Sequence, residues 1–241
     1  MPPARQTENQ LLDSLSASDY DQLRAHLQTV DLAQGITLYA TGDEIDRVYF
    51  PHSGVISLVV ALGGGGMIEA AMVGKDSIFG ASAALDGKIS LSTAIIQLPV
   101  RGSTLEVSRL RAFTESNVSF RTSLIRHDQA LFAQAQQSAA CNALHTVEAR
   151  LSRWLLRVRD LSGADDFTLT QEFLSQMLGV RRPSVSLVAN TLQQAGLIRY
   201  RRGRIEITNL EGLREVSCEC YEIVRAHYDR LLSTDRKAGR A

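Results

Sequence analysis

The pattern of apolar positions after residue 168 predicts two consecutive helices separated by a tight turn. Apolar side chains recur at helical spacing within 171–178, between Thr170, whose hydroxyl can cap a helix, and Gly179, which suits a left-handed stop. A second helix is expected over about Pro183–Gln194, because proline suits the first turn of a helix. This arrangement is typical of a helix-turn-helix.

Two short strands are predicted directly after these helices. Leu197–Tyr200 and Arg204–Thr208 have strand-like composition, and Gly203 between them permits the positive φ of a tight hairpin. The segment from 181 to 204 holds six arginines and no acidic residue. Guanidinium groups suit phosphates and guanine edges, so the pattern indicates a winged helix-turn-helix that binds duplex DNA. The simpler alternative is a solvated basic surface in an arginine-rich protein, since only three of the 26 basic residues are lysine.

The N-terminal half has a different pattern. Residues 8–28 have helical spacing and predict two short helices, after which short β-like runs alternate with glycine-containing turns. The runs are 36–39, 48–50, 55–62, 67–72, 93–98 and 104–107, and the turn signals lie at Gly42, Gly54, 63–66 and Gly102. Many short strands with regular turns predict a β-roll or jelly roll.

A long helix is predicted between these two regions, over 117–143. Its apolar stripe consists of Phe120, Leu124, Leu131 and Ala135, and small residues follow that would permit the close approach of a second helix. Polar residues interrupt any single heptad register. The stripe therefore suits either an ordinary core or a dimer interface.

The C-terminal segment resembles the DNA-binding domain of the Crp/Fnr family, the cyclic-AMP-receptor-like transcription regulators. The resemblance rests on Thr170–Glu172, Gln176–Gly179, Arg182, Val185 and Gly196–Ile198. It implies an α+β fold with an N-terminal β-roll (jelly-roll, cyclic-nucleotide-binding-like), a long dimerisation helix and a C-terminal winged helix-turn-helix. It also implies a homodimer that binds a palindromic operator in double-stranded DNA and works with RNA polymerase.

This layout divides the chain into four parts. They are 1–116 for the N-terminal helices and the β-roll sensor, 117–145 for the dimerisation helix and hinge, 146–232 for the winged helix-turn-helix domain and 233–241 for a disordered tail. Pro183 and Leu187 stand where the family's recognition helix commonly carries a glutamate and a second arginine. The operator is therefore expected to differ from the family's usual one.

Two sets of site residues are expected. The candidates for DNA contact are Thr170, Gln171, Arg181, Arg182, Ser184, Ser186, Asn190, Arg201, Arg202 and Arg204. By resemblance, the candidates for the effector pocket are Gly80, Ala81, Ser82, Ser92 and Thr93.

The pocket chemistry implied by the family has changed in this chain. Nucleotide-binding members use a glutamate for the ribose and an Arg-Ser or Arg-Thr pair for the phosphate. Here Ala81 stands near the glutamate position, and no arginine occurs between Arg47 and Arg101. Burying an uncompensated phosphodiester is costly, so cyclic AMP and cyclic GMP are not expected as effectors. No cofactor is predicted, and the effector is left unidentified.

Other classes of function are disfavoured by the residue types present. A metal-dependent jelly-roll enzyme needs several histidine and carboxylate ligands, but His52 is the only histidine between 32 and 107. The chain has no nucleophile elbow and no phosphate-binding loop. Neither an enzyme nor a metal site is therefore expected. A protein-interaction module with the shape of a regulator is the alternative from another class.

The three cysteines, Cys141, Cys218 and Cys220, do not form a disulfide framework. None lies in the N-terminal region, where oxygen-sensing members of the family hold an iron–sulfur cluster. Cys218 and Cys220 fall in a predicted closing helix over 210–232, where a separation of two places them on different faces. A redox sensor acting through Cys218 and Cys220 is the less favoured alternative to a buried cysteine beside an exposed one.

Charge and hydropathy complete the expectations. The net charge is zero, but residues 146–241 hold 16 of the 26 basic and 12 of the 26 acidic side chains, which leaves 10 and 14 for 1–145. The excess of positive charge lies in the half expected to bind DNA. No run of about 18 apolar residues and no signal peptide is evident, so a cytoplasmic protein without a membrane partner is expected.

Overall fold

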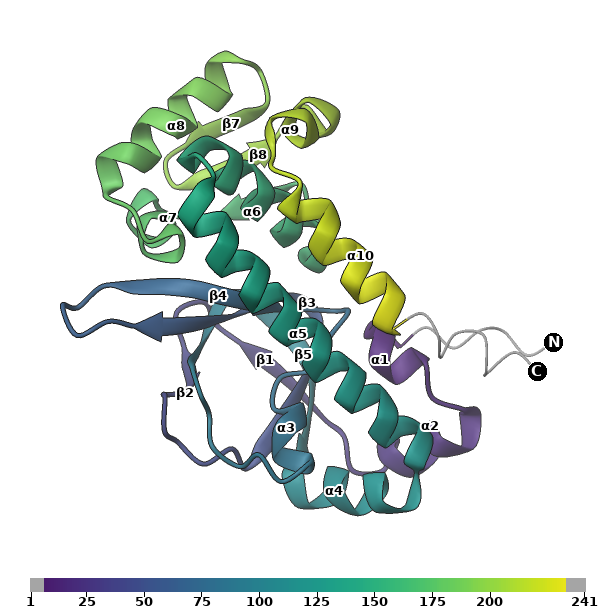
Figure 1. Ribbon diagram of the computed structural model, residues 1–241. Coiled ribbons are helices and arrows are strands. Elements are labelled where there is room, and N and C mark those ends of the chain that lie inside the picture. Colours follow the sequence, from purple (N-terminus) through teal and green to yellow (C-terminus); the bar gives the residue numbers. More distant parts are fainter. Residues whose placement is uncertain (1–6, 233–241) are drawn as a thin grey trace.

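The computed structural model describes residues 7–232, in which a β-roll, one long helix and a C-terminal helical domain follow one another (Figure 1). The helices are α1 (Gln10–Asp13), α2 (Ala17–Arg24), α3 (Ala81–Ala84), α4 (Val107–Ser116), α5 (Val118–Leu144), α6 (Val147–Ser162), α7 (Gln171–Leu178), α8 (Arg182–Gln194), α9 (Leu210–Val216) and α10 (Cys220–Leu232). The strands are β1 (Gln28–Leu32), β2 (Thr37–Tyr39), β3 (Arg47–Ala61), β4 (Met67–Val73), β5 (Thr93–Glu106), β6 (Asp166–Thr168), β7 (Ile198–Arg201) and β8 (Arg204–Ile207). The predicted α+β class is confirmed. The tail predicted over 233–241 lies outside the described residues, and no helix within 7–232 has both the length and the apolarity needed to cross a membrane.

The β-roll is an antiparallel sheet in the order β1-β5-β3-β4, with β2 also paired to β5. Its two central strands are longer than the sequence predicted, because Gly54 and Gly102 are not turns. Both lie inside strands, where an added Cβ would come 2.0 Å from Pro99 O and 2.7 Å from Phe50 O, respectively. Glycine at these positions permits the close backbone approach of an irregular strand pair.

The two N-terminal helices lie where they were predicted, and Ser16 caps the start of α2. Strand β1 was not predicted. Its side chains are exposed or half-buried throughout, so it lacks the apolar alternation by which strands are recognised.

The long helix α5 packs one face against the roll. Asn117 caps its start by accepting a hydrogen bond from Phe120 N over 2.9 Å. Phe120 and Leu124 are buried in the core of the roll, so the predicted stripe serves the chain's own core. Gln134 and Ser138 are also buried, and therefore these polar residues do not interrupt the outer face of the helix.

The C-terminal domain contains the predicted helix-turn-helix and wing, with a three-stranded sheet in the order β6-β8-β7. The closing helix predicted over 210–232 is instead two helices. Residue Ser217 is extended, with φ −74° and ψ 158°, and separates α9 from α10. Both Cys218 and Cys220 are buried. The prediction that they occupy opposite faces of one helix is wrong, because Cys218 lies in the break after α9 and Cys220 is the first residue of α10.

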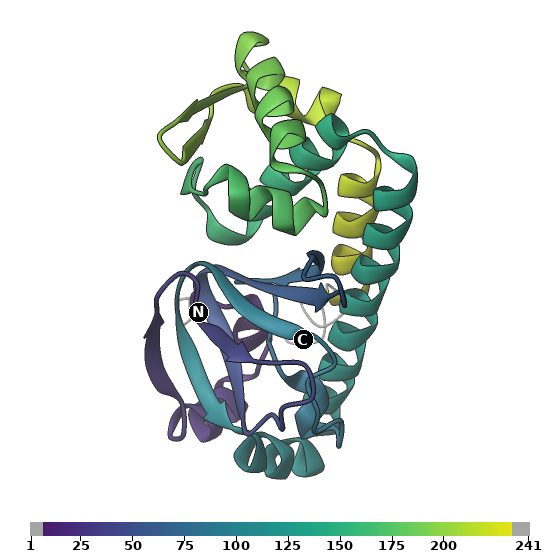
Figure 2. The same cartoon turned by 90° about the vertical axis from the view of Figure 1, so that its left-hand side faces the viewer.

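The two domains pack against each other through a shared apolar cluster. Val55 and Met72 of the roll belong to the same cluster as Trp154 of α6. An ion pair of 2.9 Å between Arg157 Nη2 and Asp76 Oδ2 also joins the domains. Helix α10 runs back along α5, as Figures 1 and 2 show, so the end of the chain returns toward the roll.

Candidate nucleic-acid interface and effector pocket

Local signals fix both helices of the helix-turn-helix. Thr170 Oγ1 accepts a hydrogen bond from Phe173 N over 3.1 Å, which confirms the predicted cap of α7. Gly179 ends that helix with φ 62°, the left-handed conformation that was predicted. Val185 and Leu192 are fully buried and hold α8 on the domain. The opposite side of α8 is left facing solvent.

The exposed side of α8 carries Arg182, Leu187 and Asn190. Leu187 is 69% exposed, so its apolar side chain is available for contact with a partner. Ser184 and Ser186 are half-buried at the edge of this face, and Ser186 Oγ donates to Gln171 Oε1 over 2.6 Å. The predicted candidates on α7 and α8 are thus brought together.

The wing is a hairpin with two residues in its loop. Arg201 pairs with Arg204, and the loop residues Arg202 and Gly203 have φ 51° and 77°. Positive φ at both loop positions is the geometry that suits the twist of a two-residue hairpin. Leu169 N donates to Gly203 O over 2.6 Å, which ties the wing to the start of α7.

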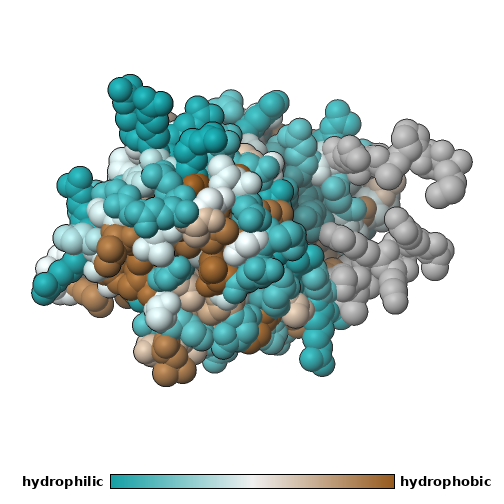
Figure 3. Space-filling view, turned by 90° about the horizontal axis from the view of Figure 1, so that it is seen from above, coloured by the Kyte–Doolittle hydropathy of each residue, from teal (hydrophilic) through white to brown (hydrophobic). Residues whose placement is uncertain are grey.

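The arginines of this surface differ in their ion pairing. Arg204 pairs with Asp166, and Arg199 Nη1 lies 2.7 Å from Glu206 Oε2, so each is matched by a carboxylate within the small sheet. Four other arginines are exposed and form no ion pair within the described part of the chain; they are Arg181, Arg182, Arg201 and Arg202. These four provide the unmatched positive charge at this end of the molecule. Figure 3, which looks onto this end, shows a largely hydrophilic surface with separate apolar patches.

The turn between α7 and α8 rests on the roll. An added Cβ on Gly179 would come 2.6 Å from Ile68 Cδ1 of strand β4. The end of α7, which leads into α8, is therefore in direct contact with the sheet of the roll.

A cavity of about 160 Å³ lies in the roll where the effector pocket was predicted. Gly80, Ala81, Ser82 and Ser92 line it, and Asp128 and Leu131 of α5 contribute to its wall. The predicted residue Thr93 does not line it. Thr93 Oγ1 lies 3.3 Å from Thr41 Oγ1, because its position on β5 turns the side chain toward the β2 segment.

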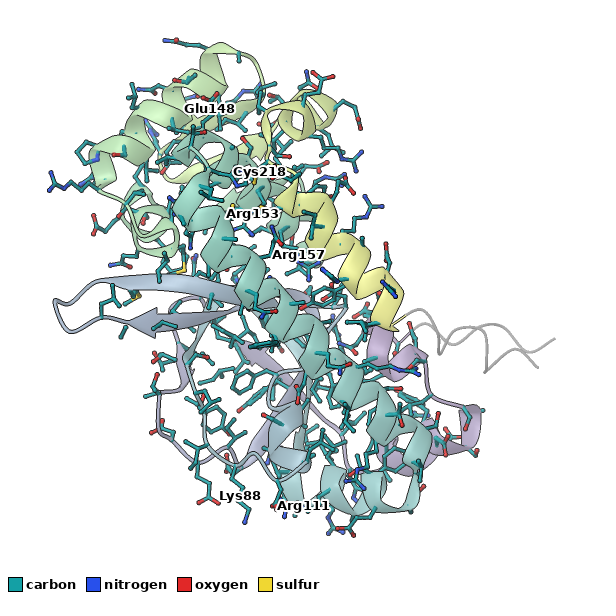
Figure 4. All side chains as sticks on the ribbon, in the orientation of Figure 1. Lys88, Arg111, Glu148, Arg153, Arg157 and Cys218 are labelled. Atoms are coloured by element: carbon teal, nitrogen blue, oxygen red, sulfur yellow. The ribbon has the colours of Figure 1, made fainter. Side chains whose placement is uncertain are left out.

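No basic side chain is among the described residues that line this cavity. Lys88 lies in a separate outer cleft with Arg111, at the far end of the roll (Figure 4). Lys75 lies instead at the junction of the domains, where its Nζ is 3.2 Å from the position of an added Cβ on Gly163. The cavity wall therefore offers one carboxylate and the hydroxyl groups of three serines, but no cation.

Comparison with known proteins agrees with this arrangement. Residues 149–216 match the family profile of the Crp-like helix-turn-helix domain. Over 198 residues, the chain is 24% identical to the CRP-like cAMP-activated global transcriptional regulator of Mycobacterium tuberculosis, which covers 79% of this chain and 88% of that protein. The C-terminal part of the chain is thus a Crp-like helix-turn-helix domain, and the chain as a whole is similar to a CRP-like transcriptional regulator.

The fold of the regulator is similar to those of solved Crp/Fnr proteins. A CRP-family transcriptional regulator from Thermus thermophilus matches 78% of this chain and 96% of its own, with a TM-score of 0.65 and 24% identity. FixK2 from Bradyrhizobium japonicum matches 80% and 98%, with a TM-score of 0.66 and 18% identity. The predicted order of roll, long helix and winged helix-turn-helix is therefore confirmed as a fold.

Sequence reasoning missed an outer face of the regulator's α5. Val118, Ile125 and Phe132 are exposed large apolar residues on this helix. With Ala139, which is also exposed, they recur every seven residues. The spacing was visible in the sequence, but Phe120 and Leu124 gave the stronger apolar stripe. Only the packing of the roll shows which stripe is already used.

Proposed function

We propose that this regulator binds duplex DNA as a homodimer, with α8 in the major groove and the wing on the phosphate backbone. The observation that carries the proposal is the solvent-facing side of α8, with Arg182, Leu187 and Asn190, next to the unmatched arginines at the wing tip. A helix of this width fits the major groove, where each base pair presents a distinct pattern.

Each exposed side chain of α8 suits a different base edge. The guanidinium of Arg182 fits the two acceptors of guanine, and the amide of Asn190 fits the donor and acceptor of adenine. Leu187 offers an apolar surface that suits the methyl group of thymine. Leu187 stands where the family's recognition helix commonly carries a second arginine. The operator should therefore differ from the family's usual one at the base that this position reads.

The wing suits contacts that do not depend on sequence. Arg201 and Arg202 lie at the tip of a hairpin, exposed and without acidic partners in the described chain. Backbone phosphates are the natural target of such groups, because cation release on binding favours association at low salt.

The outer stripe of α5 supports dimerisation. A strict repeat of seven suits a helix that packs along a second helix, and two-fold symmetry would bring the same stripe of both copies together. Two recognition helices related by this axis would read half-sites about 34 Å apart, one turn of the duplex.

We also propose that cyclic AMP and cyclic GMP are not effectors of this protein, although the mycobacterial relative is named cAMP-activated. The cavity of about 160 Å³ is smaller than the roughly 300–1,000 Å³ of typical ligand pockets. Its wall contains Asp128, and a carboxylate there would repel a phosphodiester.

Selection of bound sequences from random duplexes, followed by gel shift with a salt titration, tests the proposed function. We expect one enriched motif with two-fold symmetry and half-sites one turn apart. Equal binding of all duplexes, a single half-site, or no DNA binding at all would overturn the proposal; the last result would favour a protein-interaction module.

A further inference from the structure

Four side chains that ligate metals meet at the junction between α5 and α10. Cys141 lies near the end of α5 and His145 caps that helix, whereas Cys218 and Cys220 come from the break between α9 and α10. One ligand atom from each of the four lies within 4.8 Å of all the others. The three cysteines are buried and the side chain of His145 is 24% exposed.

The spacing of these atoms is close to that of a tetrahedral site. Cys141 Sγ is 3.5 Å from Cys218 Sγ, and Cys220 Sγ is 3.5 Å from His145 Nδ1. Bonds of about 2.3 Å to sulfur and about 2.0 Å to nitrogen place tetrahedral ligands roughly 3.5–3.8 Å apart. The widest observed separation therefore exceeds this by about 1 Å, a distance within reach of small side-chain rotations.

The groups around the cluster have the arrangement found around metal ligands. His145 presents Nδ1 to the sulfurs, and its Nε2 lies 3.3 Å from Glu219 Oε1 on the outer side. A carboxylate on the far nitrogen fixes the tautomer of a metal-bound imidazole. Gln137 Nε2 donates to Cys220 Sγ over 3.0 Å, a contact that stabilises a thiolate.

Positive charge lies beside the cluster. Arg150 and Arg153 of α6 are both buried, and both interact electrostatically with the Cys141 thiol. Three thiolates around a divalent ion carry one net negative charge, which these guanidinium groups can balance.

We propose that Cys141, His145, Cys218 and Cys220 bind one zinc ion in a closed tetrahedral site. Four sulfur and nitrogen ligands are the set that zinc prefers in structural sites, and no ligand position is left open for a substrate. An iron–sulfur cluster fits less well, because it distributes its protein ligands over separate iron atoms and so holds them farther apart.

The site would fasten the hinge of the regulator. Cys141 lies near the end of α5 and His145 lies in the short connection from α5 to α6, whereas the other two ligands come from the start of α10 and the segment before it. Zinc therefore fixes the angle between α5 and the domain that carries α8. This consequence, unlike zinc binding itself, rests on the proposed function.

Metal analysis of the purified full-length protein tests the site directly. We expect one zinc per chain and, after exchange with cobalt, the visible absorption of a tetrahedral thiolate complex. The double variant Cys218→Ser, Cys220→Ser should lose the metal, and the matched control His227→Ala on α10 should keep it. A poorly folded double variant would also lose metal, so Glu219→Gln provides a second test, with all four ligands kept and zinc affinity expected to fall about 10–100-fold.

Several results would overturn the zinc site. They are a chain without metal, a Cys141–Cys218 disulfide in mass spectra of unreduced peptides, iron with acid-labile sulfide, or unchanged affinity in Glu219→Gln. Removal of zinc with a chelator is expected to weaken operator binding at least tenfold. If zinc is bound but its removal leaves DNA binding unchanged, the hinge role is wrong. If the protein binds no DNA either with or without zinc, the proposed function is wrong. The measured zinc content still shows whether the zinc site exists.

Discussion

Trp154 of α6 donates a hydrogen bond from Nε1 to Oε1 of Glu69 on β4, over 3.0 Å, across the boundary between the two domains. Glu69 is buried, and Ser57 donates to its other oxygen. Burial raises the pKa of this carboxyl to about 7, while Ser57, Arg153 and Trp154 act in the opposite direction. A titrating group therefore lies inside the contact that orients the DNA-binding domain.

The first prediction concerns pH. The ordinary pKa of a glutamate is 4.5, and in the folded protein that of Glu69 is about 7. Between these two pH values Glu69 is protonated in the folded protein but ionised in the unfolded chain. The free energy of unfolding should therefore fall as pH rises through this window, by at most on the order of 3 kcal/mol. Above the window it should level off. Urea unfolding between pH 5 and 8 measures this change. Glu69→Gln should flatten the dependence, and Glu115→Gln, an exposed control on α4, should not. An unchanged slope in Glu69→Gln would rule out this residue as its source.

The second prediction concerns base recognition. Arg182→Ala should weaken binding to the selected operator by about 1–3 kcal/mol and relax the preference at one base position, because a bidentate guanine contact is lost. Arg225→Ala is the control, since this exposed arginine lies on α10 and is paired with Glu222. Gel shifts on the operator and on single-base variants measure both effects. Equal affinity of Arg182→Ala and the parent protein for the operator would remove Arg182 from the interface.

The third prediction separates the fold of the wing from its charge. Arg202 adopts a left-handed conformation that glycine accepts more readily, so Arg202→Gly should change the free energy of unfolding by less than about 1 kcal/mol. The same change should weaken binding to all duplexes alike. It should also reduce the slope of log affinity against log salt concentration by about one. A loss confined to the operator would instead assign Arg202 to base reading.

The fourth prediction concerns the dimer. Phe132→Glu should give a monomer at micromolar concentration, because a charge in the centre of the α5 stripe would be buried against its symmetry mate. Ile36→Glu introduces the same change at an exposed apolar residue of the roll and should leave the dimer intact. Light scattering after size exclusion gives the mass, and circular dichroism checks folding. A folded Phe132→Glu dimer would show that the copies meet elsewhere.

The fifth prediction concerns nucleotides. Calorimetric titration with cyclic AMP or cyclic GMP should show no binding at micromolar concentration, because the described wall of the cavity holds Asp128 and no cation. Micromolar binding together with tighter operator affinity would contradict this. If Lys88→Ala then abolished that binding, the lysine would have left its outer cleft to replace the family's arginine.

The sequence predicted the helix-turn-helix nearly residue by residue, since its ends depend on local chemistry. Thr170 caps one helix, Gly179 ends it and Pro183 lies in the first turn of the next. These signals act over three or four residues and need no knowledge of the rest of the chain.

Features that depend on distant packing were predicted less well. Gly54 and Gly102 read as turns because their strand partners lie far away in the sequence. The two faces of α5 could not be assigned until the roll had covered one of them. Likewise, Cys141 and Cys218 are 77 residues apart, and only the break at Ser217 brings them together.

The shared apolar cluster has a consequence for exchanging parts between regulators. Val55 and Met72 complete the core that contains Trp154, so each domain alone would expose an apolar face to water. A chimera joined at the hinge would pack the roll of one regulator against the C-terminal domain of another, and the two apolar surfaces would not be complementary. The DNA-reading unit that can be transplanted is therefore larger than the winged helix-turn-helix and includes the outer surface of the β3–β4 hairpin.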